Sequence, residues 1–433
     1  MNRIISFVIS SFILISCGGG GGGGSSAPTP APTPAASVTI SAESSKGYTT
    51  QNSAISWTSS NASSCTASNA WSGTKGTSGT ETYSFTSAGS YTFSISCSGS
   101  GGSGSDSVTI NVFDYKKVVE AVPENYEWDA YTQATVVNWY TPGTINGVYS
   151  ETWLENLAFA GIGNNYPLTT TVIEPNESSL NIRYEGSDTR EQPVNLNLQF
   201  NAWNQDIIPL YEVGNTEPSY ALIYASFQDL DVAVFTPYPD KQIAENILYV
   251  TGGQLIGETK DGLRTYLLPT LYGDYTQASD MPSGTRAIQG DAIYYLHEAS
   301  YLSSNTYNVN LAVSGTSNIN FDFDNGTLTG ELVLKDFMDL DEFLIGNGPN
   351  ALYTSIPTYT INLLNGGIIG EIFYAELSLE DSVNDVFLTG YLEGRFFGPD
   401  GREIAASISF YDNDSEFTDD LFLGGGLLIG NYE

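Results

Sequence analysis

The sequence predicts an all-β protein with a β-sandwich near its N-terminus, a β-rich middle region and a closed antiparallel barrel at its C-terminus. The composition supports this fold class, because 28 Tyr and 20 Phe occur among 433 residues and aromatic residues favour strands. Apolar and polar residues alternate over short runs, as they do in strands with one buried face. Glycine and asparagine separate many of these runs, which is typical of hairpin turns.

The charge balance excludes several classes of function. The chain has 14 Lys and Arg against 49 Asp and Glu, a formal net charge of -35. Nucleic-acid-binding proteins neutralise phosphates with basic side chains, so we expect no nucleic-acid partner. One His and three Cys are too few for zinc clusters, paired-His haem ligation or iron–sulfur centres, so we expect no metal and no cofactor.

Residues 1–16 have the pattern of a lipoprotein signal peptide. Asn2 and Arg3 precede an apolar run over residues 4–15, which is too short to span a membrane as a helix. The run ends in Leu-Ile-Ser-Cys at residues 14–17, which resembles the lipobox of bacterial lipoproteins. The resemblance implies that Cys17 receives the lipid, and the glycine after it implies sorting to the outer membrane. The alternative is an ordinary signal peptide with a chance cysteine.

Residues 17–36 are expected to form a flexible linker. Seven consecutive glycines at 18–24 cannot fold, and the alternating Ala, Thr and Pro of residues 27–36 favour polyproline II. The linker would hold the next domain away from the membrane.

Residues 37–112 are predicted to form a β-sandwich. Period-two runs occur at Val38 and Ile40, Ile55 and Trp57, and again near residues 91–95 and 108–112. Around its Trp and Cys residues, this segment resembles the Ig-like repeats of bacterial surface proteins, which act mostly as stalks. Cys65 and Cys97 are expected to form a disulfide in an oxidising compartment, and a pair of free thiols is the alternative.

Residues 113–275 have a mixed pattern that indicates mostly antiparallel β structure. The clearest alternation lies at residues 194–200 and around residues 221–235. Four Trp fall in this region and would serve either the core or a binding face: Trp128, Trp139, Trp153 and Trp203.

Residues 276–433 show the strongest strand signal in the chain. Apolar residues alternate over 307–313, 319–323 and 386–396, and an Asn-Gly pair at 325–326 indicates a hairpin. Glycine and alanine at inward positions suit strands that coil around a narrow centre. A meander of hairpins closed into a barrel is therefore expected, and closure would remove exposed edges.

Three stretches of this region resemble the β-barrel domain of transferrin-binding protein B and its lipoprotein relatives. They are DMPSGT at 280–285, NINFDFDNGTLTG at 318–330 and GYLEGRFFGPDGREIAA at 390–406, of which FFGPDGREIA is the most recognisable piece. The resemblance implies an eight-stranded antiparallel barrel paired with a β-rich handle-like region at 113–275, where relatives often grip a protein ligand. It is carried over for the fold and not for transferrin as ligand, because we find one such lobe where transferrin receptors of this type have two.

Other candidate chemistry is weaker. His297 is the only imidazole, and no nucleophile motif accompanies it, so a solvated or strand-packed His is favoured. Residues 412–416, from Asp412 to Glu416, alternate oxygen ligands as a Ca²⁺ loop does, but the expected glycine is Phe417 and a charged hairpin loop is favoured. Asp336, Asp339, Asp341 and Glu342 are expected to form a solvated loop.

The sequence thus predicts a non-enzymatic lipoprotein on the outer surface of a bacterial outer membrane. It would act as a ligand-binding receptor for nutrient or iron-carrier capture, with a protein ligand and a TonB-dependent transporter as expected partners. One alternative is a structural or adhesive envelope lipoprotein without a transport role. A second is a carbohydrate-active enzyme that uses two carboxylates.

Overall fold

The structure is a computed structural model of the chain, and its description covers most of the predicted strands. The described residues are 31–49, 51–118, 128–132, 135–138, 170–175, 179–187, 193–201, 207–210, 220–226, 230–237, 246–260, 264–302, 305–339, 358–381, 386–412 and 420–432. The signal peptide, Cys17 and residues 413–416 of the suggested Ca²⁺ loop lie outside them. Contacts divide the chain into two compact units, and the second comprises Lys46–Asn52, Ser84–Gly89 and Asn111–Glu433.

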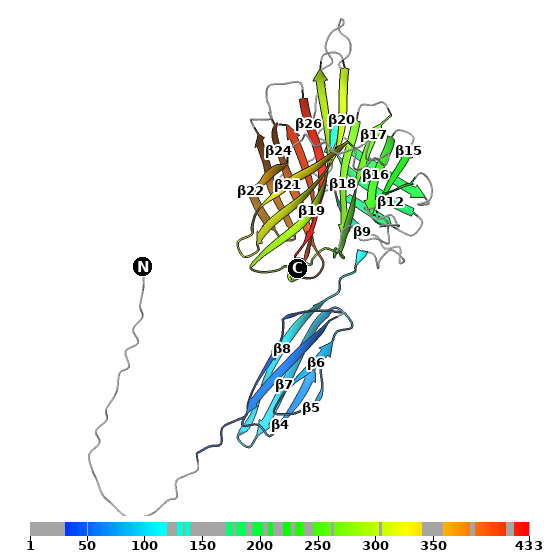
Figure 1. The fold of residues 1–433 in the computed structure, drawn as a ribbon. Coiled ribbons are helices and arrows are strands. Elements are labelled where there is room, and N and C mark those ends of the chain that lie inside the picture. The colour runs from blue at the N-terminus through cyan, green and yellow to red at the C-terminus, as the bar shows by residue number, and fades with distance from the viewer. Residues whose placement is uncertain are drawn as a thin grey trace, which may run out of the picture. The chain divides into compact units, whose positions relative to one another are not determined.

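Eight strands follow the linker and form two sheets (Figure 1). The three-stranded sheet has the order β1-β3-β6 and the five-stranded sheet the order β2-β8-β7-β4-β5. Their bounds are β1 (Ser37–Ala42), β2 (Lys46–Tyr48), β3 (Asn52–Ser60), β4 (Ser64–Asn69), β5 (Gly73–Lys75), β6 (Ser78–Ser84), β7 (Gly89–Gly99) and β8 (Gly102–Phe113). The alternation seen in the sequence places apolar residues of these strands inside the sandwich.

An aromatic cluster and a disulfide form the core of the first unit. Trp71 meets Trp57 and Phe93 edge to face, with ring centroids 5.3 and 5.8 Å apart. Both indole N–H groups donate to backbone carbonyls, so neither ring leaves a buried donor unpaired. Cys65 and Cys97 are directly opposite each other on β4 and β7 and form a disulfide, with 4.0 Å between their Cα atoms. The disulfide therefore joins neighbouring strands of one sheet, whereas antibody domains join their two sheets.

The middle region forms a ten-stranded antiparallel sheet. Its order is β13-β12-β11-β9-β18-β17-β16-β15-β14, and β10 also pairs with β18. The bounds are β9 (Trp128–Thr132), β10 (Thr135–Asn138), β11 (Thr170–Pro175), β12 (Ser179–Ser187), β13 (Pro193–Asn201), β14 (Ile207–Leu210), β15 (Tyr220–Ser226), β16 (Leu230–Pro237), β17 (Val250–Thr259) and β18 (Arg264–Gly273).

The C-terminal region is a closed barrel of eight antiparallel strands, which confirms the predicted fold class. Strand β19 pairs with its sequence neighbour β20 and also with the last strand β26, and this second pairing closes the barrel. The bounds are β19 (Thr285–Leu302), β20 (Asn305–Asp322), β21 (Thr327–Asp339), β22 (Tyr359–Ile369), β23 (Ile372–Asp381), β24 (Val386–Phe397), β25 (Glu403–Asp412) and β26 (Asp420–Asn431). Asp336 and Asp339 lie within β21, so the loop predicted for them was wrong at these two positions.

Aromatic and aliphatic side chains form the core cluster inside the barrel. Phe321 contacts Phe373 and Phe396, with ring centroids 5.1 Å apart in each pair, and all three rings are fully buried. Gly394 faces this cluster, and a Cβ atom there would lie 2.5 Å from Phe373 Cζ and 2.4 Å from the Ala405 carbonyl oxygen. The predicted role of glycine at inward positions is thus seen at Gly394, where no side chain fits.

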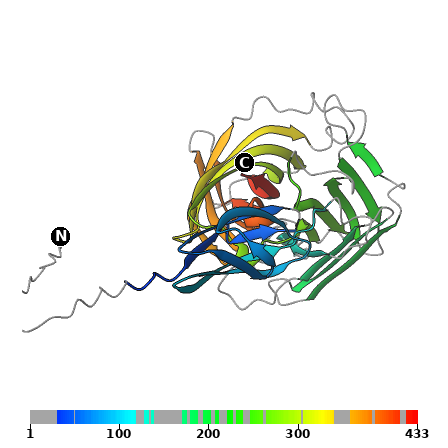
Figure 2. The same cartoon turned by 90° about the horizontal axis from the view of Figure 1, so that it is seen from below.

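The ten-stranded sheet packs against the outside of the barrel. β17 and β18 lie against β25 and β26, and Figure 2 shows the strands of the sheet (green) beside those of the barrel (yellow to red). A second cluster of buried apolar residues packs between the sheet and the barrel: Ile247, Val250, Leu271, Phe397, Ala405, Leu427 and Ile429. Barrel and sheet therefore form one packed body.

Candidate functional site

Four carboxylates lie where the connecting segments of the second unit meet the turns at one end of the barrel. We call this set the carboxylate junction: Asp274, Asp280, Asp400 and Glu403. Asp280 closes a short 3-10 turn (Ala278–Asp280), and Asp400 lies in the turn Pro399–Gly401 between β24 and β25. Asp274 directly follows β18 and Glu403 begins β25, so the main fold fixes the positions of these two.

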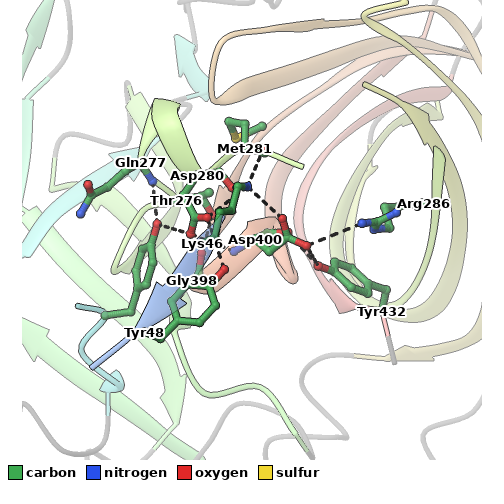
Figure 3. A network of polar contacts seen from close by, with 11 residues as sticks. Lys46, Tyr48, Thr276, Gln277, Asp280, Met281, Arg286, Gly398, Asp400 and Tyr432 are labelled. Atoms are coloured by element: carbon green, nitrogen blue, oxygen red, sulfur yellow. Dashed lines mark hydrogen bonds and ion pairs between the residues drawn. The ribbon is translucent and has the colours of Figure 1, made fainter. Parts of the chain in front are cut away.

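Asp280 is, like Glu403, a fully buried member of the junction. Its side chain is 0% exposed, and it accepts hydrogen bonds from the Tyr48 hydroxyl at 3.3 Å and the Tyr115 hydroxyl at 3.0 Å. The backbone N–H of Asp400 donates to it at 3.1 Å (Figure 3). Burial, followed in Tyr48 by the charge of Asp280, raises the pKa of both tyrosines, so they remain protonated donors.

Lys46 supplies the positive charge of the junction. Its ammonium lies 3.2 Å from carboxylate oxygens of Asp280 and Asp400 and donates to the backbone carbonyls of Asp280 at 2.8 Å and Met281 at 3.0 Å. Strand β2 presents Lys46 because β2 pairs in parallel with Asn111–Phe113, within the second unit. The three N–H groups of one ammonium thus serve two carbonyls and the Asp400 carboxylate, and the same charge forms an ion pair with Asp280.

Asp400 extends the junction toward the C-terminus of the chain. Its backbone has φ 54°, a left-handed conformation that suits the tight Pro-Asp-Gly turn. Arg286 lies 3.6 Å from its carboxylate, and the Tyr432 hydroxyl donates to its backbone carbonyl at 2.7 Å. Burial, with the charge of Asp400, raises the pKa of Tyr432 to about 12.

Glu403 and Asp274 fix the ends of the sheet strands. Glu403 is 0% exposed, and the consecutive N–H groups of Leu248, Tyr249 and Val250 donate to its carboxylate at 2.8, 2.8 and 3.2 Å. Burial raises the pKa of Glu403 to about 7, although the three N–H donors oppose the shift. Asp274 accepts from the Lys116 N–H at 2.6 Å, and burial raises its pKa too.

The geometry of the junction suits the joining of distant chain segments better than it suits the binding of a ligand. Each of its carboxylates is engaged by donors of the chain itself, from segments that are far apart in sequence. Among the described residues, no group of three or more His, Cys, Asp or Glu is arranged to hold a metal ion. We therefore assign the junction a positional role: it holds β2, the segment after β8 and the first residues of β17 against the barrel turns.

A polar hollow in the barrel wall is a second candidate site. It has a volume of about 480 Å³ and lies over β19, β20 and β21. Its lining is uncharged or acidic: Gln289, Gly290, Asp291, Thr316, Ser317, Asn318, Glu331 and Val333. No lysine or arginine occurs in the sequence between Arg286 and Lys335, so this part of the barrel offers amides, hydroxyls and carboxylates to a partner.

The structure brings together few of the residues singled out from the sequence. His297 lies in β19, opposite Asn310 of β20 and Leu423 of β26. Asp280, Asp400 and Glu403 fall inside the motifs that carried the resemblance, but the sequence reading assigned them no role. Lys46 could not be singled out, because nothing in the sequence links it to residues more than 230 positions away.

Comparison with known families identifies the class of barrel. In the part of the chain that the structure describes, no helix is both long and apolar enough to span a membrane. Residues 281–420, about a third of the chain, match the family described as the C-lobe and N-lobe beta barrels of Tf-binding protein B. This match and the closed eight-stranded barrel confirm the resemblance predicted from the three sequence motifs. The barrel has the transferrin-binding protein B type of fold.

Solved structures of transferrin-binding protein B are among the similar proteins. A single-residue mutant from Haemophilus parasuis is 12% identical, with 61% of this chain and 54% of that chain covered and a TM-score of 0.29. A mutant from Actinobacillus pleuropneumoniae is 14% identical, with 70% and 100% covered and a TM-score of 0.30. The protein from Neisseria meningitidis is 10% identical, with 64% and 61% covered and a TM-score of 0.28. No curated protein sequence matches the chain.

Proposed function

We propose that this protein is a non-enzymatic surface receptor of a bacterial outer membrane, anchored by a lipid on Cys17, and that it captures a protein ligand. The match of residues 281–420 to the barrels of transferrin-binding protein B carries the proposal. The ten-stranded sheet packed against the barrel would correspond to the handle-like region predicted at 113–275.

The charge of the distal region supports a partner of opposite charge. Residues 113–433 contain 46 acidic and 11 basic residues, whereas the preceding sandwich is nearly neutral. Complementary charge speeds association and makes binding depend on ionic strength. We therefore propose a ligand with a basic surface, nutrient or iron-carrier capture as its purpose and a TonB-dependent transporter as a second partner.

The N-terminal features support display away from the membrane. The lipobox at residues 14–17 would place acyl chains on Cys17, and each buried methylene contributes about 0.8 kcal/mol to anchoring. The linker at 17–36 and the sandwich at 37–112 would then lift the barrel and sheet into reach of large partners.

A membrane-fractionation experiment tests the anchor. Cys17→Ser is expected to move the protein from the outer-membrane fraction to the soluble fraction while the head stays folded, and Ser26→Ala is the matched control in the linker. Protease added to intact cells should degrade the wild-type chain. A Cys17→Ser protein that still fractionates with membranes would contradict the lipid anchor, and full protection from protease would contradict surface display.

Transferrin is the first ligand to test, because the matched family is named for binding it. Binding of transferrin to the soluble Cys17→Ser chain would define the ligand. If transferrin does not bind, proteins with basic surfaces come next, and the structural or adhesive role becomes the favoured alternative only when none of them binds.

A further inference from the structure

Strand β13 forms one edge of the ten-stranded sheet. It pairs with β12 along its whole length, from Pro193 opposite Ser187 to Asn201 opposite Ser179. Among the strands that the structure describes, none pairs with its other side. An unpaired strand edge presents a row of N–H and C=O groups to which another strand can add.

The two edges of this sheet differ in how they are protected. The opposite edge strand, β14, has only four residues and carries Pro209 within it, and short or proline-containing edges resist strand addition. By contrast, β13 has nine residues, and Pro193 stands only at its first position. None of its nine residues is charged, although the distal region has 57 charged residues. Within the part of the chain that the structure describes, the β13 edge therefore has neither the proline interior nor the charges that usually protect such an edge.

The sequence of β13 is complementary to itself. We propose that β13 pairs antiparallel with β13 of a second copy of this chain, around a twofold axis at Asn197. This register places Leu196 opposite Leu198 and Val194 opposite Phe200. Residues opposite each other lie on the same face of a sheet, so apolar positions meet apolar ones. The polar positions match in the same way, with Asn195 opposite Gln199.

In the register between β13 and β12, apolar residues are again opposite apolar residues. Leu198 is opposite Ile182 and Leu196 is opposite Tyr184, so apolar positions occupy one face across both strands. In the dimer this face would extend over four neighbouring strands. No like charges would stand directly opposite each other within β13, which removes the usual local penalty for pairing two acidic chains.

Electrostatics distinguishes this contact from ligand capture. Two chains of net charge -35 repel each other, and salt screens that repulsion. Dimerisation should therefore strengthen as ionic strength rises, whereas capture of a basic ligand should weaken. The proposed dimer does not depend on the proposed receptor function.

Sedimentation velocity of the soluble Cys17→Ser chain tests the proposal. We expect a monomer–dimer equilibrium within about 1–100 μM protein, with more dimer in 0.5 M than in 0.05 M NaCl. Asn197→Lys should weaken dimerisation at least tenfold, because two lysines would stand opposite each other. Asn181→Lys makes the same change on the same face of the inner strand and should not. A chain that stays monomeric throughout, or a dimer unaffected by Asn197→Lys, would overturn the proposal.

Cysteine cross-linking tests the register independently. In a background with Cys17→Ser, Asn197→Cys should form covalent dimers under mild oxidation, because the twofold axis places both copies of the residue side by side. Asn195→Cys is the control, since its two copies would lie four residues apart along the paired strands. Equal cross-linking of both variants would contradict the register, and no cross-linking of Asn197→Cys would overturn the pairing.

Discussion

Lys46 and Asp280 are 234 residues apart in sequence, yet the Lys46 ammonium lies 3.2 Å from the Asp280 carboxylate. The carboxylate is fully buried, while the lysine side chain is 28% exposed. Burial of a carboxylate without a counter-charge costs free energy of folding. The ion pair therefore favours the position of β2 next to the barrel end that carries Asp280.

Removal of the Lys46 charge should destabilise the second unit. Lys46→Met leaves Asp280 with neutral donors only, and we expect the free energy of unfolding to fall by about 1–3 kcal/mol, less than for a fully buried pair because Lys46 is partly exposed. Denaturant titration measures the loss. Lys260→Met is the control, because Lys260 and Asp231 are 3.9 Å apart and both well exposed; an equal loss in both variants would show that the junction has no special role.

Glu403 should make stability depend on pH. Burial raises its pKa to about 7, above the usual 4.5, so the folded state holds the proton more tightly than the unfolded state does. Its contribution is fully present below pH 4.5 and is lost as the pH rises through about 7, with an upper limit of about 3 kcal/mol. The raised pKa of Asp274 acts in the same direction.

Glu403→Gln is the variant that isolates this effect. It should flatten the dependence of thermal stability on pH between 4.5 and 7, and it should lower stability at pH 7.5, because an amide N–H₂ would face a backbone donor. Asp322→Asn is the control, since hydrogen bonds from Asn325 lower the pKa of Asp322 below this window. An unchanged slope in Glu403→Gln would show that Glu403 does not titrate there.

The sequence was sufficient to predict the barrel because its signals are local. Alternation, hairpin turns and inward glycines each depend on residues a few positions apart, and β19 to β26 follow each other around the barrel in chain order. The ten-stranded sheet was harder to predict. Its order places β9 between β11 and β18, and no pattern in the sequence indicates which distant strands will pair.

The carboxylate junction could not be predicted for the same reason. Lys46, Asp280 and Asp400 are brought together only by closure of the barrel and pairing of β2 with β8. The two cysteines are different, because a count of cysteines in an exported chain leaves a single pair once Cys17 is set aside. The structure forms that disulfide between Cys65 and Cys97.

Gly394 should tolerate no side chain. Gly394→Ala would place a Cβ 2.4 Å from the Ala405 carbonyl oxygen, and overpacking of this kind costs about 1–3 kcal/mol. The melting temperature of the barrel is the measurement. Gly284→Asn is the control, because no atom lies within 4 Å of a Cβ there and asparagine accepts its φ of 72°. A neutral Gly394→Ala would indicate that the strands can move apart at this point.

Loss of the disulfide should affect the first unit selectively. The cross-link closes a loop of 32 residues, which corresponds to roughly 3–4 kcal/mol in the chain-entropy model. Calorimetry of the Cys65→Ala, Cys97→Ala double variant should show a lower transition for the sandwich and an unchanged transition for the barrel. Equal loss in both transitions would mean that the two units unfold together.

Capture of a protein ligand by the soluble Cys17→Ser chain is the most direct test of the proposed receptor. We predict saturable binding of transferrin, or of a protein with a basic surface, with affinity that falls at least tenfold between 0.05 and 0.5 M NaCl and no chemical change in the bound protein. Turnover of a glycan by the purified chain, or no saturable binding of any protein with a basic surface in 0.05 M NaCl, would contradict it.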